Sequence, residues 1–205
     1  AQEREHPFNL AFALCNAGVL FNVLRRELSA ARDHVEPLIR LSAEEGFPLY
    51  QALGSFLRGW FLAGEGQAEE GMAQMHQSLA AFQATGAEIE LTRLLAMLAE
   101  ACAKIGQIEE GLKMLSEALA QVEKGQEHYW EAEIYRLKGE LLLMQAKAQA
   151  EEEAEVCFRD AEACFRRALD VARHQQAKSW ELRATVSLCR LWQKQGKNEK
   201  ARQIL

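Results

Sequence analysis

The 205-residue sequence is poor in two things, proline and positive charge. It contains 3 prolines against 49% apolar residues, a composition that excludes a proline-rich disordered chain and favours a soluble helical protein. The net charge is −6, and no Lys/Arg run is dense enough to form a basic patch. An acidic chain without such a patch repels a phosphate backbone, so we expect no nucleic-acid partner.

A membrane or signal segment is also missing. The most apolar stretch covers residues 8–24 and carries Asn9, Asn16 and Asn22, and its 17 residues stand at the short limit for crossing a bilayer. We therefore expect a helix packed between other helices. The 5 cysteines are odd in number, widely spread and free of any CxxC pair, which predicts reduced thiols and a cytoplasmic protein.

Recognisable catalytic and ligand-binding motifs are absent from the sequence. Residues 64–71, GEGQAEEG, lack the lysine of a phosphate-binding loop and are predicted to be a turn between helices. The 5 histidines form no HExxH or HxxxH pair, and no histidine lies within one turn of Cys157 or Cys164. We expect no catalytic residue, cofactor or metal here, and no enzyme activity in the chain itself.

A repeated pattern of small and apolar residues is what the sequence does contain. Its clearest copy is Gly111, Leu115, Ala118 and Leu119, which share one helical stripe. The copies before and after it stand at intervals of about 40 to 50 residues. They are Ala31, Val35, Leu38 and Ile39; Gly71, Met75, Ser78 and Leu79; Ala161, Phe165, Ala168 and Leu169; and Ala201 with Leu205.

A second amphipathic stretch lies between successive copies, so each unit is predicted to be a helical hairpin. The hairpins are expected at about 7–46, 48–85, 88–125, 129–176 and 179–205, as a single array over 1–205. Within them we expect a first helix over 7–25 and a bend at Pro37. An acidic insertion at about 148–157 is expected to extend the second helix of the fourth hairpin. Because the pattern stops in mid-unit at Leu205, we also expect the chain to be a fragment of a longer protein.

The hairpins resemble tetratricopeptide (TPR) repeats. Small residues recur at one place in the first helix, Gly59, Ala99 and Gly139, and at two places in the second. The resemblance implies an all-α, right-handed α-solenoid of about five TPR-like antiparallel hairpins. HEAT-type repeats, with units of about 40 to 47 residues, are the alternative.

A narrower resemblance covers nearly the whole chain. The strings LRGWFLAGEGQAEEG, YRLKGELLL and EACFRRALDVAR are similar to the C-terminal helical repeats of bacterial STAND/AAA-type signalling ATPases, which are often fused to nucleotide cyclase domains. It implies a protein-interaction or sensing module on a larger ATPase or cyclase. The partner would be a protein, a peptide or the chain's own ATPase domain, with no membrane involved.

The resemblance to TPR repeats also implies a concave groove lined by the first helices. Counting along each first helix gives the inward-facing residues. They are Ala13, Asn16 and Leu20; Leu53, Phe56 and Trp60; Arg93, Ala96 and Glu100; Glu133, Arg136 and Glu140; and Arg183, Val186 and Arg190. Partner binding in this groove would combine an apolar anchor, the second set, with arginines of the later sets. The alternative is that the charged residues only pair across helices, Arg93 with Glu133 and Arg136 with Glu100.

The C-terminal end suggests self-association. The last helix has no successor, so an apolar face is expected to stay uncovered and to give a weak homo-oligomer. That face comprises Leu188, Leu191, Trp192, Ile204 and Leu205. A purely structural spacer whose surfaces serve only self-association is the second functional hypothesis.

Overall fold

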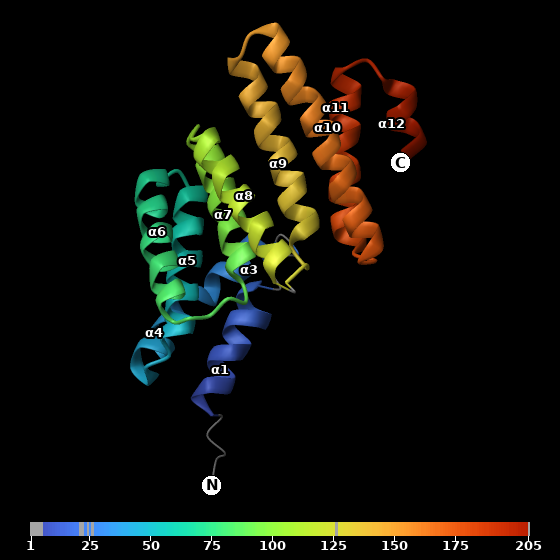
Figure 1. Cartoon of the computed structure of the whole chain (residues 1–205). Coiled ribbons are helices and arrows are strands. Elements are labelled where there is room, and N and C mark those ends of the chain that lie inside the picture. Colours follow the sequence, from blue (N-terminus) through green and yellow to red (C-terminus); the bar gives the residue numbers. More distant parts are fainter. Residues whose placement is uncertain (1–5, 21–22, 24, 26, 126, 205) are drawn as a thin grey trace. The chain divides into compact units, whose positions relative to one another are not determined.

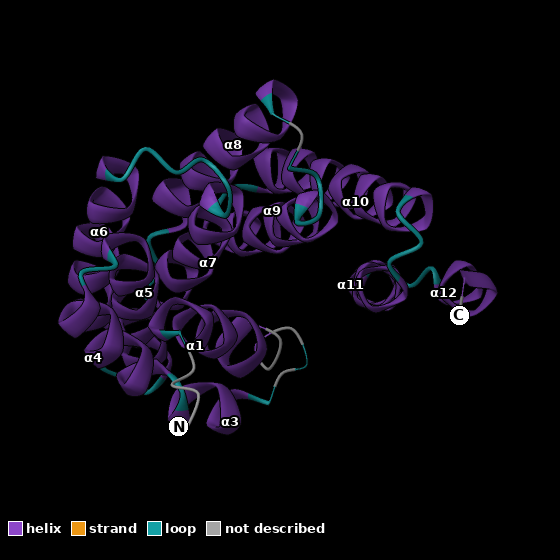
Figure 2. Cartoon of the chain, turned by 90° about the horizontal axis from the view of Figure 1, so that it is seen from below, coloured by secondary structure: helices purple, strands orange, loops and turns teal. Residues whose placement is uncertain are grey.

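The computed structural model describes residues 6–20, 23, 25, 27–125 and 127–204. In these residues the secondary structure is helical, joined by short loops (Figures 1 and 2). The chain divides into two compact units, Ala1–Glu88 and Ile89–Leu205, which are called the first and the second unit below. The positions of the two units relative to one another are left open, and each unit is described by itself.

The first unit begins with an irregular helix. A short α-helix, α1 (Pro7–Ala13), gives way to a π-helical stretch, η1 (Leu14–Leu20), so the regular helix expected over 7–25 is wrong. The side-chain amide of Asn16 donates to the carbonyl oxygen of Phe12 at 3.0 Å, and this carbonyl is the one an α-helix would offer to the backbone N–H of Asn16. A side chain that competes for the i−4 carbonyl favours a locally widened helix.

The second helix of this unit is broken rather than bent. It forms two pieces, α3 (Leu28–Asp33) and α4 (Val35–Glu45), which meet at His34. Pro37 is the third residue of α4, where its missing N–H costs no helical hydrogen bond. In a continuous helix its ring would press on the carbonyl of Asp33, so ending one helix and starting another removes the clash.

The hairpin of α5 (Pro48–Gly64) and α6 (Ala68–Ala84) follows, with its two helices side by side (Figure 1). Gly59 and Gly71 face each other across it. A Cβ atom on Gly71 would lie 2.5 Å from the Gly59 carbonyl oxygen and 2.5 Å from the Ala63 nitrogen. The two backbones therefore touch, because neither glycine carries a side chain that would keep them apart.

The second unit continues the same hairpin pattern. Its elements are α7 (Leu91–Lys104), α8 (Ile108–Lys124), α9 (Glu131–Gln145), the 3-10 turn η2 (Ala146–Ala148), α10 (Glu151–His174), α11 (Lys178–Lys194) and α12 (Asn198–Ile204). Each α-helix packs against the next one along the chain. Gly106 and Gly196 occupy left-handed turns after α7 and α11, with φ of 80° and 72°, where a side chain would be strained.

The acidic insertion lengthens α10, as predicted. At 24 residues α10 is longer than the 17-residue α6 and α8, and its first turn carries Glu151, Glu152 and Glu153. These exposed carboxylates complement the positive end of the helix dipole. We call the exposed start of α10, Glu151–Val156, the acidic spur.

The C-terminal end is better covered than the sequence suggested. Leu188, Leu191 and Trp192 of α11 are buried in a cluster to which α10 and α12 contribute. The other buried members include Ala161, Phe165 and Ala201, and Ile204 packs against the cluster half-buried. The expectation of an uncovered apolar face is therefore wrong for these residues, because the single short helix α12 suffices to cover them. Leu205 lies outside the described residues.

Candidate functional site

The residues expected to form an apolar anchor are buried. Leu53, Phe56 and Trp60 on α5 are 4%, 1% and 5% exposed. Because almost none of their surface is accessible to a ligand, these three residues belong to the packed core of the unit. Of the preceding set, Ala13 is exposed, whereas Asn16 and Leu20 are half-buried.

The accessible side of the α5–α6 hairpin is polar instead. A hollow of about 560 Å³ runs between the two helices. Its polar lining comprises Gln51, Ser55, Arg58, Gln74, Gln77 and Ser78. The Gln74 amide already donates to the Ser55 carbonyl oxygen at 2.9 Å, so part of this lining is engaged within the hairpin.

On α7, the predicted site residues lie in the interior. Arg93 is 1% exposed, and its Nε lies 2.5 Å from Glu90 Oε2. Tyr129 donates its hydroxyl to the same oxygen at 2.6 Å. The structure thus pairs Arg93 with Glu90, one turn earlier on the chain, where the sequence had suggested Glu133. Ala96 is buried as well, and Glu100 is half-buried.

The start of α7 is held by residues from the α8–α9 loop. Glu90, at the N-cap, has a left-handed φ of 82°, which is strained for a non-glycine residue. Its backbone N–H donates to Glu127 Oε1 at 2.8 Å. Burial raises the pKa of Glu127, and the charge of Glu90 adds to this, while the backbone hydrogen bond opposes it. Burial and the Glu90 charge also raise the pKa of Tyr129, which therefore stays a hydrogen-bond donor.

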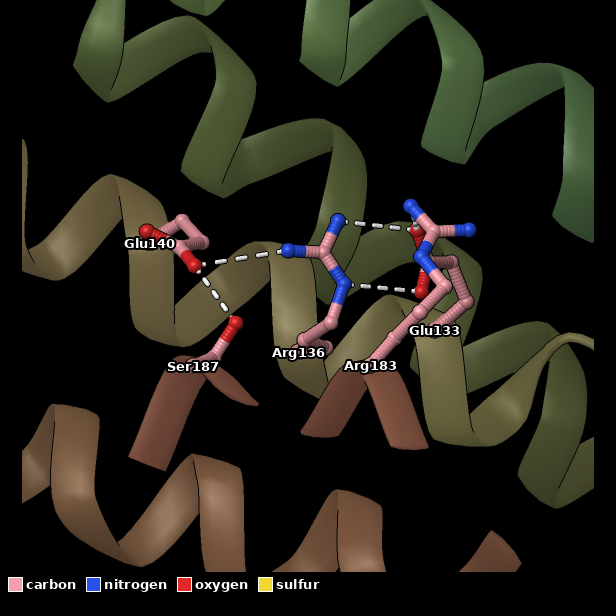
Figure 3. A network of polar contacts seen from close by, with 5 residues as sticks. All are labelled: Glu133, Arg136, Glu140, Arg183 and Ser187. Carbon is pink, nitrogen blue, oxygen red and sulfur yellow. Dashed lines mark hydrogen bonds and ion pairs between the residues drawn. The ribbon is translucent and has the colours of Figure 1, made fainter. Parts of the chain in front are cut away.

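Four of the remaining predicted residues, Glu133, Arg136, Glu140 and Arg183, meet in one network between α9 and α11 (Figure 3). Glu133 on α9 is 3% exposed and accepts two hydrogen bonds from Arg136, at 2.8 Å from Nε and 2.8 Å from Nη2. Arg183 reaches it from α11, with Nη2 2.5 Å from Glu133 Oε1. Two guanidinium groups therefore neutralise one buried carboxylate, in the bidentate geometry that suits arginine.

Glu140 extends the network one turn further along α9. Its Oε1 lies 3.4 Å from Arg136 Nη1 and accepts the hydroxyl of Ser187 on α11 at 2.6 Å. Burial alone would lower the pKa of Arg136, but the hydrogen bonds from Arg136 to Glu133 and the charges of Glu133, Glu140 and Glu100 outweigh it and raise the pKa. Arg136 is thus a permanent cation placed among carboxylates from α7 and α9.

Aromatic rings hold the N-terminal ends of α9 and α11 together. The ring centroids of Trp130 and Trp180 lie 5.3 Å apart, and both rings are buried. The Arg183 guanidinium stacks 5.1 Å from the Trp180 ring, a cation–π contact. Held by Glu133 and by this ring, Arg183 is fixed in one orientation while a quarter of its side chain stays exposed.

The far end of α11 differs, because its charged residues are unengaged. Val186 is half-buried, and Arg190 is exposed. Within the described part of the chain, no carboxylate forms an ion pair with Arg190. The predicted charged residues of the groove therefore fall into two groups. The mostly buried residues Arg93, Glu133 and Arg136 form ion pairs inside the unit. The other three, Glu140, Arg183 and Arg190, are accessible, and we call them the accessible rim.

Sequence reasoning missed the partners of these residues. Ser187, Glu90, Glu127 and Tyr129 all complete the two networks, yet none was singled out. Ser187 and Glu140 are 47 positions apart, so only their helix faces could have suggested the contact. Glu127 lies in a loop, where no helical period applies.

The described residues contain no group of three His, Cys, Asp or Glu side chains arranged to hold a metal ion. No helix among them is both long and apolar enough to span a bilayer.

Comparison with known proteins identifies the fold. No protein-family model matches the chain, and no curated protein matches it. Solved structures do match, and among them are two of a kinesin light chain-like protein of Podosopora anserina with nearly identical TPR-like repeats. A single-residue variant of that protein is 15% identical, with a TM-score of 0.61. The parent protein is 16% identical, with a TM-score of 0.59, and both alignments cover 98% of this chain and 93% of the other.

Identities this low establish the fold alone. The expected fold class, an all-α solenoid built from TPR-like helical hairpins, is confirmed.

Proposed function

We propose that this chain is a protein-interaction scaffold whose binding surface is the accessible rim on α9 and α11. The observation that carries the proposal is Arg183, which Glu133 and Trp180 hold in place while part of it faces solvent. A side chain that is already ordered loses little conformational entropy when a partner binds, and arginine is a frequent hot-spot residue. Repeat arrays of this kind expose long surfaces suited to other polypeptides.

The larger protein, in this proposal, is a cytoplasmic signalling ATPase or cyclase. Support comes from the strings LRGWFLAGEGQAEEG and YRLKGELLL, which resemble the repeat region of such proteins. The partner would then be another protein, a peptide or the ATPase domain of the same chain. We expect no nucleic-acid partner, because the net charge is −6, and no membrane partner.

Catalysis is assigned elsewhere in that protein. The sequence has no phosphate-binding loop, and the buried Glu133 of the second unit is engaged with Arg136 and Arg183. Purified chain should therefore hydrolyse and cyclise no nucleotide. Saturable ATP turnover that co-purifies with the chain would contradict this assignment.

Two measurements test the scaffold proposal. The gene sequence upstream of Ala1 should encode a P-loop, and its absence would remove the ATPase context. If the P-loop is there, the purified upstream part should bind this chain in calorimetry, and Arg183→Ala should weaken binding by about ten-fold. Arg202→Ala, at an exposed site on α12, is the control. Equal binding by both variants, with unchanged melting temperatures, would exclude the α9–α11 rim.

A further inference from the structure

One side of α11 is open along its length. Leu182, Val186, Arg190 and Lys194 follow one another at intervals of four residues, so they form a stripe about 18 Å long. Leu182 is 63% exposed, Val186 is half-buried, and Arg190 and Lys194 are both exposed. We call these four residues the α11 stripe. Its first half is apolar and its second half is cationic.

The charges of the stripe have no counter-ion nearby. Among the described residues no carboxylate pairs with Arg190 or Lys194, although the chain as a whole carries an excess of acidic groups. The opposite side of α11 is occupied, because Leu188 and Trp192 pack against Ala161 and Phe165 of α10. The stripe therefore points away from α10 of its own copy.

The acidic spur has the complementary character. Glu151, Glu152, Glu153 and Glu155 are exposed, and within the described residues none of them forms an ion pair. Val156 is an exposed apolar residue one turn after Glu152. The spur thus offers unpaired carboxylates beside an apolar side chain at the start of α10.

The spacings of the two segments match in antiparallel orientation. Glu152 and Val156 are four residues apart, as are Arg190 and Val186, so both pairs span about 6 Å along a helix. With the helices antiparallel and Val156 level with Val186, Glu152 is level with Arg190, and Glu155 lies about 4.5 Å from that level along the helix axis, within reach of the long arginine side chain. Lys194 lies about 6 Å beyond Arg190 on the side of Glu151 and Glu152. Oppositely charged surfaces of this kind steer and align two partners.

From this complementarity we propose that the α11 stripe of one copy docks the acidic spur of a second copy. The contact goes beyond the proposed function, and it uses a different surface from the C-terminal apolar face that α12 covers. Because the stripe and the spur are different surfaces, the contact is head-to-tail and leaves a free stripe and a free spur at the ends of each dimer. A small interface with exposed charges predicts weak association, with a Kd of about 1 mM or somewhat below.

Sedimentation equilibrium tests the contact by charge reversal. The unmodified chain should associate as its concentration approaches about 1 mM. Raising the ionic strength from about 0.1 M to about 1 M, which shortens the Debye length from about 10 Å to about 3 Å, should weaken this association. The stripe variant Arg190→Glu with Lys194→Glu and the spur variant Glu152→Lys with Glu155→Lys should each associate about ten-fold more weakly.

Mixing the two variants is the decisive step. Each would restore what the other lacks, so the mixture should associate as strongly as the unmodified chain. Lys200→Glu with Arg202→Glu, which makes the same charge change on α12, should leave association unchanged. Melting curves establish that each variant is folded. The proposal fails if the unmodified chain is monomeric throughout, if the stripe variant associates normally, or if the mixture stays monomeric.

Discussion

The α5–α6 hairpin of the first unit and the α9–α11 pair of the second unit hold two helices together by different means. In the hairpin, Gly59 and Gly71 let two backbones touch, and the neighbouring residues of α5 are apolar and buried. Between α9 and α11, a buried glutamate binds two arginines. Backbone contact depends on the absence of side chains, whereas the ion network depends on every member being present. The same repeat pattern therefore tolerates different substitutions in its two units.

The largest effect is expected in the first unit, at Trp60. Trp60→Ala should lower the free energy of unfolding by about 3 to 5 kcal/mol, because the side chain is buried and leaves a large cavity. Urea unfolding followed by circular dichroism measures the loss. Arg58→Ala, on the exposed side of the same helix, should cost little by comparison. A stable Trp60→Ala variant would restore Trp60 as a candidate binding residue.

In the second unit, removing Glu133 should be nearly as costly. Glu133→Ala removes the buried carboxylate that Arg136 and Arg183 share, which predicts a loss of about 3 kcal/mol in urea unfolding. The matched control is Glu162→Ala, which breaks the more exposed pairs to Arg166 and Lys197 and should cost about 1 kcal/mol or less. Similar losses at both positions would mean that burial does not strengthen the α9–α11 network.

Glycine substitutions should differ between the units as well. At Gly71 the new methyl group meets backbone atoms of α5, so Gly71→Ala should cost about 1 to 3 kcal/mol from overpacking, against about 1 kcal/mol gained in helix propensity. At Gly111 the nearest atom, 2.6 Å from the new Cβ, is the end of the Leu141 side chain. The nearest backbone atom, the Ala99 carbonyl oxygen, is 3.2 Å away, so Gly111→Ala should cost less than Gly71→Ala. Thermal melts that rank the two variants in the opposite order would contradict the backbone contact.

The smallest effect, and the only gain, is expected at Glu127. Because its pKa is raised in the fold, the ionised carboxylate destabilises the native state at neutral pH. The penalty is absent below about pH 4.3, the ordinary pKa of glutamate, and grows as the pH rises through the folded pKa. Glu127→Gln, whose amide oxygen can still accept the Glu90 N–H, should therefore melt slightly higher than the parent at pH 7. The difference should vanish near pH 4, and a variant that melts lower at pH 7 would contradict the assignment.

Sequence periodicity sufficed for the regular helices. The hairpin expected at about 48–85 corresponds to α5 (Pro48–Gly64) and α6 (Ala68–Ala84). These elements are governed by local rules that a single sequence carries. The π-helical stretch η1 depends on the Asn16 side chain competing with the backbone for a carbonyl oxygen. The difference in free energy between the two hydrogen bonds is small, and the spacing of apolar residues in the sequence does not reveal it.

The sequence could predict which candidate site residues share a helix face, but it could not predict how deeply their side chains are buried. Counting along the helices assigned Glu133, Arg136 and Arg183 to one groove, and the structure brings them together, with an Arg183–Glu133 pair that the counting did not propose. The same counting gave Leu53, Phe56 and Trp60 an open face, because it assumes that only one side of a helix is covered. Burial depends on how many neighbours pack around α5, which local sequence does not encode.

The close pair of indoles at the N-terminal ends of α9 and α11 gives the second unit a spectroscopic signal of its own. With ring centroids 5.3 Å apart and planes inclined by 55°, Trp130 and Trp180 form a chiral pair of strongly absorbing chromophores. Their electronic transitions couple, which should add an exciton couplet to the circular dichroism of the folded chain. The couplet requires only that α9 and α11 stay docked. It therefore gives an optical readout of that one junction, separate from the helix content that both units share.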